Sequence, residues 1–203
     1  MVHAGGYIYA FRGGSRDDFW RYNLSGDNWE TLTDAPNTIG WGGSLTWDGS
    51  DTIYALRGNT QDDFWKYSIS GNSWTTLANP PSNVKDGGAL TYVSGTIYAT
   101  RGDDQRNFWS YVVSTDTWSS LTNAPGDVEE GGSLVWDGDN YVYALRGDRS
   151  RKFWRYSISD DTWELLTDTL GDVDDGGGLT LLNGIFYAIR GDDKDDSWKF
   201  GPP

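Results

Sequence analysis

Short runs of alternating hydrophobic and polar residues, separated by glycine, asparagine and aspartate, recur along the whole chain. The clearest run is Ile-Tyr-Ala-Leu-Arg-Gly at 53–58, and related hexapeptides occur at 8–13, 97–102, 142–147 and 186–191. Their arginines are 45, 44, 45 and 44 residues apart. Alternation with a period of two is typical of half-buried β-strands, and a repeat length in the forties is typical of propeller arrays. The pattern therefore predicts an all-β repeat protein.

The repeat unit is clearest between residues 42 and 80, where the pattern predicts four strands. The strands, called A to D in chain order, are expected at 43–49, 51–57, 64–70 and 73–77. Gly71-Asn72 between strands C and D is a hairpin turn signal. Pro80-Pro81 follows strand D, and proline interrupts strand pairing at the edge of a sheet.

This unit resembles the Kelch motif. Paired glycines precede strand A, strand B ends in glycine, strand C reads aromatic-Trp-x-Tyr and strand D reads Trp-x-x-Leu. The resemblance covers essentially all 203 residues and implies four-stranded blades around a central channel, with strand A innermost and strand D outermost. The chain departs from the family at the end of strand B, where Arg-Gly stands in place of the usual Gly-Gly. Kelch domains mostly bind proteins or ligands through their loops, and a few distant relatives are enzymes.

We expect a single β-propeller domain, 1–203, of about five four-stranded Kelch-like blades. The expected blades are about 1–39, 40–84, 85–128, 129–173 and 174–203. Residues 1–4 form a shortened strand A, and the fifth blade lacks strand D, so we expect the first and last blades to close the ring by packing. The open outer edge at 196–200 is a candidate site of self-association. The alternative is that Pro202-Pro203 blunts a solvated edge.

Nine of the twelve tryptophans occupy equivalent positions and are interpreted as packing between blades. They are Trp20, Trp65, Trp109, Trp154 and Trp198 on C strands, and Trp29, Trp74, Trp118 and Trp163 on D strands. The glycine pairs begin innermost strands, where backbones converge. They do not lead from a strand into a helix, so a phosphate-binding loop is not supported.

Composition excludes several classes of function. The absence of cysteine excludes disulfides and thiolate chemistry, and the single histidine, His3, excludes a multi-histidine metal centre within one chain. Thirty acidic residues against sixteen basic ones give a net charge of −14, which repels nucleic-acid phosphates and anionic membranes. No apolar run approaches the roughly 18–20 residues that span a bilayer, so no membrane insertion is expected. The charge favours an extracellular or cell-surface location.

The sequence offers no catalytic constellation. Copper oxidases with Kelch propellers need histidine and cysteine ligands that this chain lacks. Sialidase-like hydrolases cluster arginines beside a carboxylate pair and a tyrosine nucleophile, whereas here the arginines are spread one per blade. We expect no enzymatic activity and no cofactor. Asp-rich loops such as 192–196 keep calcium binding open, although they lack the ligand spacing of a known calcium loop.

Polar residues are expected to gather on the face that carries the D–A and B–C connections. The candidate ligand-binding residues at this channel mouth are Arg12, Arg57, Arg101, Arg146, Arg190, Trp41, Asp86, Glu130 and Asp175. Because the start of strand A lies beside the end of strand B, we expect the pairs Arg101–Asp86, Arg146–Glu130 and Arg190–Asp175. Arg57 is expected to contact Trp41 as a cation–π pair, and Arg12 to have no acidic counterpart.

Two interpretations of this ring remain open. In the first, the arginine–carboxylate pairs are structural and satisfy charge at the channel mouth. In the second, the sector near Arg12 and Arg57 binds a polar or anionic ligand, with Trp41 as a stacking surface. Variable B–C loops on a rigid scaffold are typical of recognition. We therefore expect a non-catalytic module that binds a protein or glycan partner. The alternative is an architectural or oligomerising domain without a small-molecule ligand.

Overall fold

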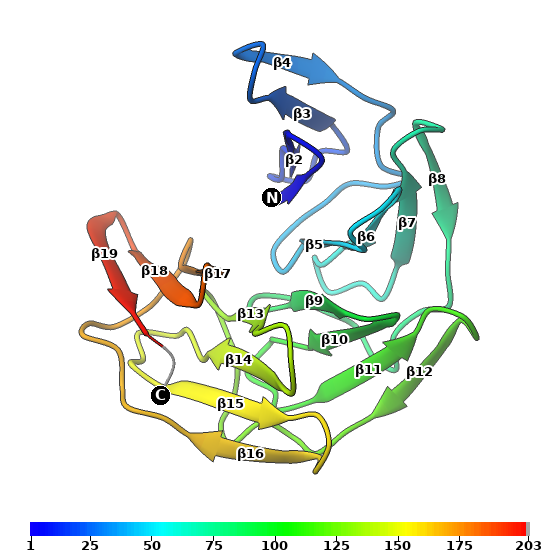
Figure 1. Ribbon diagram of the computed structural model, residues 1–203. Coiled ribbons are helices and arrows are strands. Elements are labelled where there is room, and N and C mark those ends of the chain that lie inside the picture. Colours follow the sequence, from blue (N-terminus) through cyan, green and yellow to red (C-terminus); the bar gives the residue numbers. More distant parts are fainter. Residues whose placement is uncertain (202–203) are drawn as a thin grey trace.

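The computed structural model describes residues 1–201, which fold into nineteen strands in five antiparallel sheets. The sheets are the blades of a β-propeller (Figure 1). Chain order equals strand order in every blade, from the axis outwards. No helix occurs in this range, and so none could cross a membrane. The expected all-β propeller, with a three-stranded fifth blade, is confirmed.

The strands of each blade follow directly from the repeat. Blade 1 contains β1 (Val2–Ala4), β2 (Tyr7–Phe11), β3 (Phe19–Asn23) and β4 (Asn28–Thr31). Blade 2 contains β5 (Ser44–Trp47), β6 (Thr52–Leu56), β7 (Phe64–Ser68) and β8 (Ser73–Thr76). Blade 3 contains β9 (Ala89–Val93), β10 (Thr96–Thr100), β11 (Phe108–Val112) and β12 (Thr117–Ser120). Blade 4 contains β13 (Ser133–Trp136), β14 (Tyr141–Leu145), β15 (Phe153–Ser157) and β16 (Thr162–Leu165), and blade 5 contains β17 (Gly178–Leu182), β18 (Ile185–Gly191) and β19 (Lys194–Phe200).

In blade 2 the observed strands are shorter than expected from the alternation alone. Strand B ends at Leu56, because the backbone of Arg57 bonds outside its sheet: its carbonyl accepts from the amide of Gly40, 3.3 Å away. Strand C ends at Ser68, and the backbone amide of Ile69 donates to the carbonyl of Asp51 in the turn between strands A and B. The ends of the apolar pattern are therefore turn residues.

The core lies between blades. We call the side of each blade that packs on the following blade its leading face, and the opposite side its trailing face. Phe64 on the leading face of blade 2 meets Tyr111 and Trp118 of blade 3 edge-on, with centroids 4.9 and 5.0 Å apart. Trp109 lies on the trailing face of blade 3, as Tyr111 and Trp118 do, and is only 1% exposed. The regular aromatics thus fill the wedges between blades.

The inner strands are tied together by side chains of neighbouring blades. Ser44 Oγ and Thr46 Oγ1 on β5 accept hydrogen bonds from the backbone of Leu90 and Tyr92 on β9, at 3.1 and 2.9 Å. The same contact recurs between β13 and β17, where the amide of Leu179 donates to Ser133 Oγ. Small polar residues at the axis therefore satisfy backbone groups that no sheet partner reaches.

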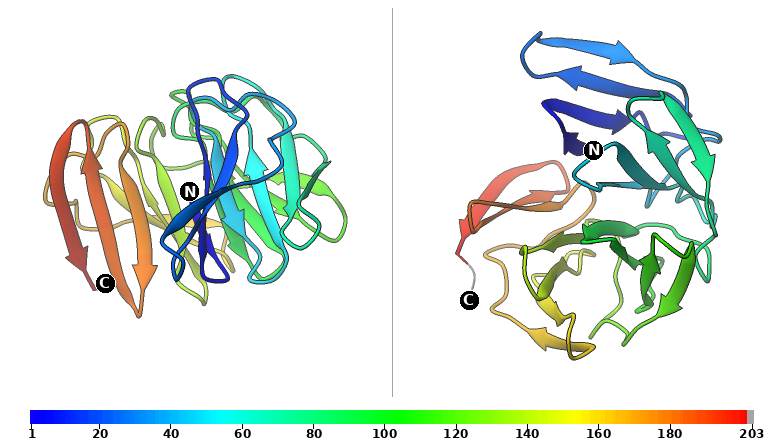
Figure 2. Two further views of the ribbon diagram at one scale, coloured as in Figure 1. Left: turned by 90° about the horizontal axis from the view of Figure 1, so that it is seen from above. Right: turned by 45° about the vertical axis from the view of Figure 1, so that its right-hand side comes forward.

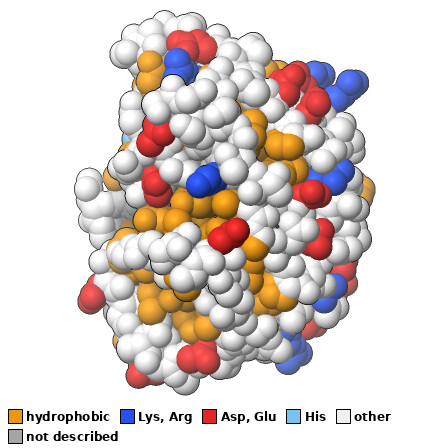
Figure 3. All heavy atoms as spheres, turned by 90° about the vertical axis from the view of Figure 1, so that its right-hand side faces the viewer, with side chains coloured by type: hydrophobic (Ala, Val, Ile, Leu, Met, Phe, Trp, Pro, Cys, Tyr) orange, Lys and Arg blue, Asp and Glu red, His pale blue; other side chains and the backbone are white. Residues whose placement is uncertain are grey.

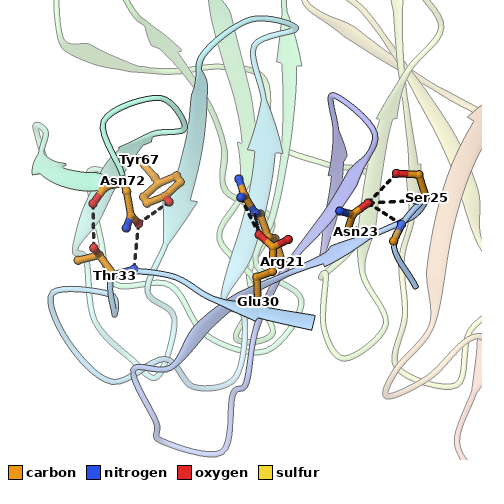
Figure 4. A network of polar contacts seen from close by, with 8 residues as sticks. Arg21, Asn23, Ser25, Glu30, Thr33, Tyr67 and Asn72 are labelled. Carbon is orange, nitrogen blue, oxygen red and sulfur yellow. Dashed lines mark hydrogen bonds and ion pairs between the residues drawn. The ribbon is translucent and has the colours of Figure 1, made fainter. Parts of the chain in front are cut away.

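A polar latch joins the outer parts of adjacent blades (Figure 4). Asn72 Oδ1 accepts from the Tyr67 hydroxyl at 2.7 Å and from the backbone amide of Thr33, in the preceding blade, at 2.9 Å. Burial raises the pKa of Tyr67 to about 12, so this hydroxyl remains a donor at neutral pH. Two further latches use an aspartate in the place of Asn72. They comprise Tyr111, Asp116 and Ala78, and Tyr156, Asp161 and Thr122.

The latch gives a prediction with a built-in control. Asp161→Ala should lower the free energy of unfolding by about 1–2 kcal/mol, because two donors lose their acceptor and alanine adopts the positive φ of this position, 52°, less readily than aspartate or asparagine. Asp161→Asn should leave it nearly unchanged, since Asn72 performs the same role in blade 2. Urea unfolding of both variants measures the difference. Equal losses in the two variants would contradict the latch.

The same carboxylate also links stability to pH. The hydrogen bond from the Thr122 amide lowers the pKa of Asp161 in the folded state. Its stabilising contribution is therefore present above the unfolded pKa and is lost as pH falls through the lower, folded pKa. Asp161→Asn should remove this part of the acid sensitivity, as seen in urea midpoints measured across the acidic range.

Blades 1 and 5 do not pack against each other, so the expected closure of the ring by packing is wrong. Hydrophobic clusters join blades 1 and 2, 2 and 3, 3 and 4, and 4 and 5, but none within residues 1–201 joins blade 5 to blade 1. The two blades stand apart in Figure 1 and in the left view of Figure 2. The physical reason is that packed aromatic side chains set each junction, and this geometry does not bring the fifth blade to the first.

Blade 5 also differs at its B–C connection. The expected loop at 192–196 is wrong for Lys194–Asp196, which belong to β19, so that only Asp192 and Asp193 form the turn. In blades 1–4 this loop is held open by a bridge to the D–A linker. The bridges are Arg16–Ile39, Gln61–Val84, Gln105–Val128 and Ser150–Val173. Blade 5 has no such bridge within the described part of the chain, and β18 and β19 stay paired up to the two-residue turn between them. The expected role of Pro202-Pro203 lies outside the described residues.

Candidate binding site at the channel mouth

Four residues, each separated from an inner strand by two glycines, meet at the propeller axis. Trp41, Asp86, Glu130 and Asp175 line one hollow of about 230 Å³ together with the glycines that follow them. Each is fixed through its backbone carbonyl, which accepts a hydrogen bond of 2.7 or 2.8 Å from the residue after the Arg-Gly of its own blade. The sequence repeat thus places four equivalent side chains around one opening, as expected.

The backbone that presents these side chains depends on glycine. Gly42, which follows Trp41, has φ +76°, and an added Cβ would collide with the carbonyl of Lys85 in the next blade. Gly87 and Gly131 have the same relation to the blades that follow them. The absence of side chains therefore lets successive blades approach closely at the mouth.

The five arginines at the ends of the B strands do not line the hollow, and three of them brace the D–A linkers. Arg57 Nε donates to the Thr38 carbonyl at 3.0 Å, and its Nη1 pairs with Asp63 at 2.7 Å. Arg101 and Arg146 donate to the linker in the same way, at 3.2 and 2.9 Å. This arrangement agrees with a structural role for the arginines.

The predicted arginine–carboxylate pairs are wrong. Among residues 1–201, Arg101 does not pair with Asp86, Arg146 does not pair with Glu130, and Arg190 does not pair with Asp175. The observed acidic partners are Asp103 at 3.8 Å, Asp148 at 2.9 Å and Asp196 at 2.8 Å, respectively. The backbones are neighbours as expected, but the carboxylates face the axis while the guanidinium groups turn to the linker and the B–C connection.

Two further expectations for this ring are also wrong. Arg12 does have an acidic partner, Asp18, at 3.2 Å. The Arg57 guanidinium group does not lie over the Trp41 ring, since the cation–π contacts in the described chain involve other residues. Trp41 is 70% exposed. Trp41 is therefore an unoccupied aromatic surface at the rim of the hollow.

Because the arginines do not line the hollow, the charge at the mouth is negative, whereas a site for an anionic ligand would be positive. Lys85 Nζ lies 3.4 Å from Asp86 and 3.3 Å from Asp103, and so neutralises part of one sector. Neither Glu130 nor Asp175 has an ion-pair partner within residues 1–201. Burial, followed by the charges of Asp86 and Asp175, raises the pKa of Glu130. The mouth is thus a focus of uncompensated negative charge, whereas acidic and basic side chains are interspersed on the face that Figure 3 shows.

The carboxylates of the mouth are not grouped as metal ligands in the described chain. In the described chain, no group of three or more His, Cys, Asp or Glu side chains is placed to hold a metal ion. Asp174, beside the mouth, is engaged by Arg149 at 2.9 Å. Calcium binding by the Asp-rich loops stays a prediction. What the mouth can do chemically is attract and hold a cationic group against carboxylates and an aromatic face.

The sequence identified the four lining residues but missed the partners of the arginines. A signal was present: Asp18, Asp63 and Asp196 each follow their arginine by six residues, a spacing that recurs in three blades. Across the antiparallel B–C connection, that spacing returns the carboxylate to the level of the arginine. Its recurrence could have indicated a pair within each of these three blades.

Comparison with known proteins supports the architecture alone. No protein-family model matches the chain, and no curated protein sequence matches it. A solved structure of the protein YjhT superposes with a TM-score of 0.75 at 14% sequence identity, over 92% of this chain and 70% of that one. Similarity at this level of identity shows a shared β-propeller fold.

Proposed function

We propose that this protein is a non-catalytic binding module of Kelch-like propeller type, which presents its channel mouth and B–C loops to a protein partner. The observation that carries this proposal is the hollow lined by Trp41 and by three carboxylates, two of which, Glu130 and Asp175, have no cationic partner within residues 1–201. A lysine or arginine side chain of the partner fits this chemistry, because it offers positive charge to Glu130 and Asp175 and a cation to the Trp41 ring.

The alternative partner, a glycan, uses the same face differently. A neutral sugar would stack on Trp41 and take hydrogen bonds from polar groups, with little dependence on salt. A basic segment would be held by charge, so its affinity should fall steeply with ionic strength. The proposal commits to the basic protein segment, because the net negative charge of the mouth favours it.

The test uses a short oligo-arginine peptide, with an oligo-glutamate peptide and neutral oligosaccharides as competing probes, in titration calorimetry. Glu130→Gln should weaken oligo-arginine binding about tenfold, since a hydrogen bond to a charged group contributes about 1.5–3 kcal/mol. Trp41→Ala should weaken it as well. Asp139→Asn removes the same charge from the opposite face of the propeller and should leave the affinity unchanged. If Asp139→Asn weakened oligo-arginine binding as much as Glu130→Gln, the loss of affinity would reflect the net charge of the protein alone, and the proposal would be contradicted.

A stability measurement separates loss of binding from loss of structure. The pKa of Glu130 is raised in the folded state, so its ionisation opposes folding above that pKa, and the penalty is relieved as pH falls. Glu130→Gln should therefore raise the melting temperature at neutral pH while it lowers affinity. A lower melting temperature would show that Glu130 supports the fold and would remove it from the proposed site.

A further inference from the structure

The last blade presents a leading face that no blade within residues 1–201 covers. Tyr187 and Ile189 on β18 are 39% and 53% exposed, whereas Tyr143 and Leu145, their equivalents in blade 4, are at most 2% exposed. A hollow of about 630 Å³ lies over this face, lined by β17, β18 and β19. Gly176 repeats the geometry of Gly42, with φ +76°, but nothing lies within 4 Å of an added Cβ. The position of a following blade is therefore empty.

The first blade presents the complementary trailing face. Ile8, Trp20 and Tyr22 are partly exposed, although their equivalents in blades 2, 3 and 4 are at most 2% exposed. Trp29 on the outer strand is 56% exposed. Blade 1 thus keeps the full set of aromatic and aliphatic residues with which blades 2, 3 and 4 pack on their predecessors.

Blade 1 also carries a latch of which only one half is formed. The Tyr22 hydroxyl bonds to Asp27, as Tyr156 does to Asp161. In the other latches the carboxylate or amide then accepts a backbone amide from the preceding blade, but Asp27 has no such donor within residues 1–201. The indole of Trp29 likewise lacks the carbonyl that its equivalents reach in the preceding linker. Those equivalents are Trp74, Trp118 and Trp163.

The four junctions inside the chain show what covers such faces: a trailing face always packs on a leading face. We propose that the trailing face of blade 1 in one copy of this chain packs on the leading face of blade 5 in a second copy. The chain cannot make this contact with itself without repacking its other junctions, because blades 1 and 5 stand apart. A head-to-tail contact of this kind leaves one free face at each end and allows further copies to add.

The shape of the two faces favours this pairing. At each of the first three junctions, a phenylalanine on the leading face inserts between a tyrosine and a tryptophan of the next blade. Blade 5 has Ser197 at that position and Gly178 where blade 4 has Ser133, which opens the hollow. Tyr22 and Trp29 are already paired, with centroids 5.3 Å apart. Placed as in the other junctions, their rings would fill the space that the missing phenylalanine leaves.

The test measures the mass of the complete chain by sedimentation or light scattering over a wide range of protein concentration. The wild-type chain should associate as concentration rises. Ile189→Lys places a charge on the apolar leading face of blade 5, and Trp29→Lys places one on the trailing face of blade 1. Both residues are more than half exposed in a single copy, so the fold should tolerate the charge, which a circular dichroism spectrum checks. Each variant alone should be monomeric, with association weakened at least tenfold.

Mixing the two variants provides the decisive measurement. The Trp29→Lys copy keeps an intact blade 5 and the Ile189→Lys copy keeps an intact blade 1, so an equimolar mixture should form a dimer that grows no further. Leu165→Lys, on the outer strand of blade 4, is the matched exposed control and should associate like the wild type.

Three results would overturn the proposal. A wild-type chain that stays monomeric at all concentrations would show that copies do not cover these faces. Association that survives Trp29→Lys would assign the contact to the open edge of β19. Failure of the mixture to recover a dimer would show that the two faces are not partners. None of these outcomes bears on the channel mouth, which lies at a different place on each copy.

Discussion

Trp109→Ala is expected to lower the free energy of unfolding by about 3–5 kcal/mol, the usual cost of truncating a buried tryptophan. Trp109 lies on β11 with 1% of its surface exposed, in the cluster that joins blades 2 and 3. For a chain of this size each kcal/mol corresponds to about 2–4 °C in melting temperature. Calorimetry should therefore record a fall of about 6–20 °C.

Trp20 is the matched control, because it occupies the equivalent position on β3 of blade 1. It lacks a preceding blade and is partly exposed, so Trp20→Ala removes fewer contacts and leaves a space that water already reaches. Its cost should be less than half that of Trp109→Ala, measured in dilute protein where copies are separate. Equal costs would mean that the wedge between blades is not the source of the stability.

Gly42→Ala is expected to have an effect of similar size through the backbone. Gly42 combines φ +76° with a close approach of Lys85, whose carbonyl oxygen an added Cβ would overlap. The left-handed conformation alone costs a residue with a Cβ about 1–2 kcal/mol, and the overlap forces blades 2 and 3 apart. We expect a total loss above about 3 kcal/mol in urea unfolding.

Gly176→Ala isolates the contribution of the neighbouring blade. Gly176 has the same φ, +76°, but no atom within 4 Å of the added Cβ, so only the conformational cost of about 1–2 kcal/mol applies. The difference between the two variants measures the contact between blades at the mouth. If both lose the same free energy, glycine is required there for its backbone conformation and not for close approach.

Several features could be predicted from the repeat because they recur in every unit. The period, the strand order and the position of Trp41, Asp86, Glu130 and Asp175 around one opening depend on local pattern and on the symmetry of the array. The confirmed fold shows that these short-range signals suffice for the architecture. The position of the lining residues follows, because equivalent residues in a ring of blades must face the same axis.

The direction of the side chains could not be predicted in this way. Arg101 and Asp86 are close through their backbones, yet the guanidinium group finds the Asn83 carbonyl of the linker and the carboxylate faces the channel. Strand adjacency specifies backbone neighbours, whereas the orientation of a long side chain depends on every acceptor within its reach. The sign of the charge at the mouth follows from that orientation.

The chain thus encodes in its linear pattern a set of near-identical blades, their inner and outer strands, and the residues that fill the wedges between them. Whether five such blades close a ring was decided by their packing in three dimensions. Closure depends on the sum of small rotations at four aromatic junctions, and no one repeat contains that quantity. The exposed faces of blades 1 and 5 and the acidic mouth are both consequences of packing between units, which sequence periodicity does not describe.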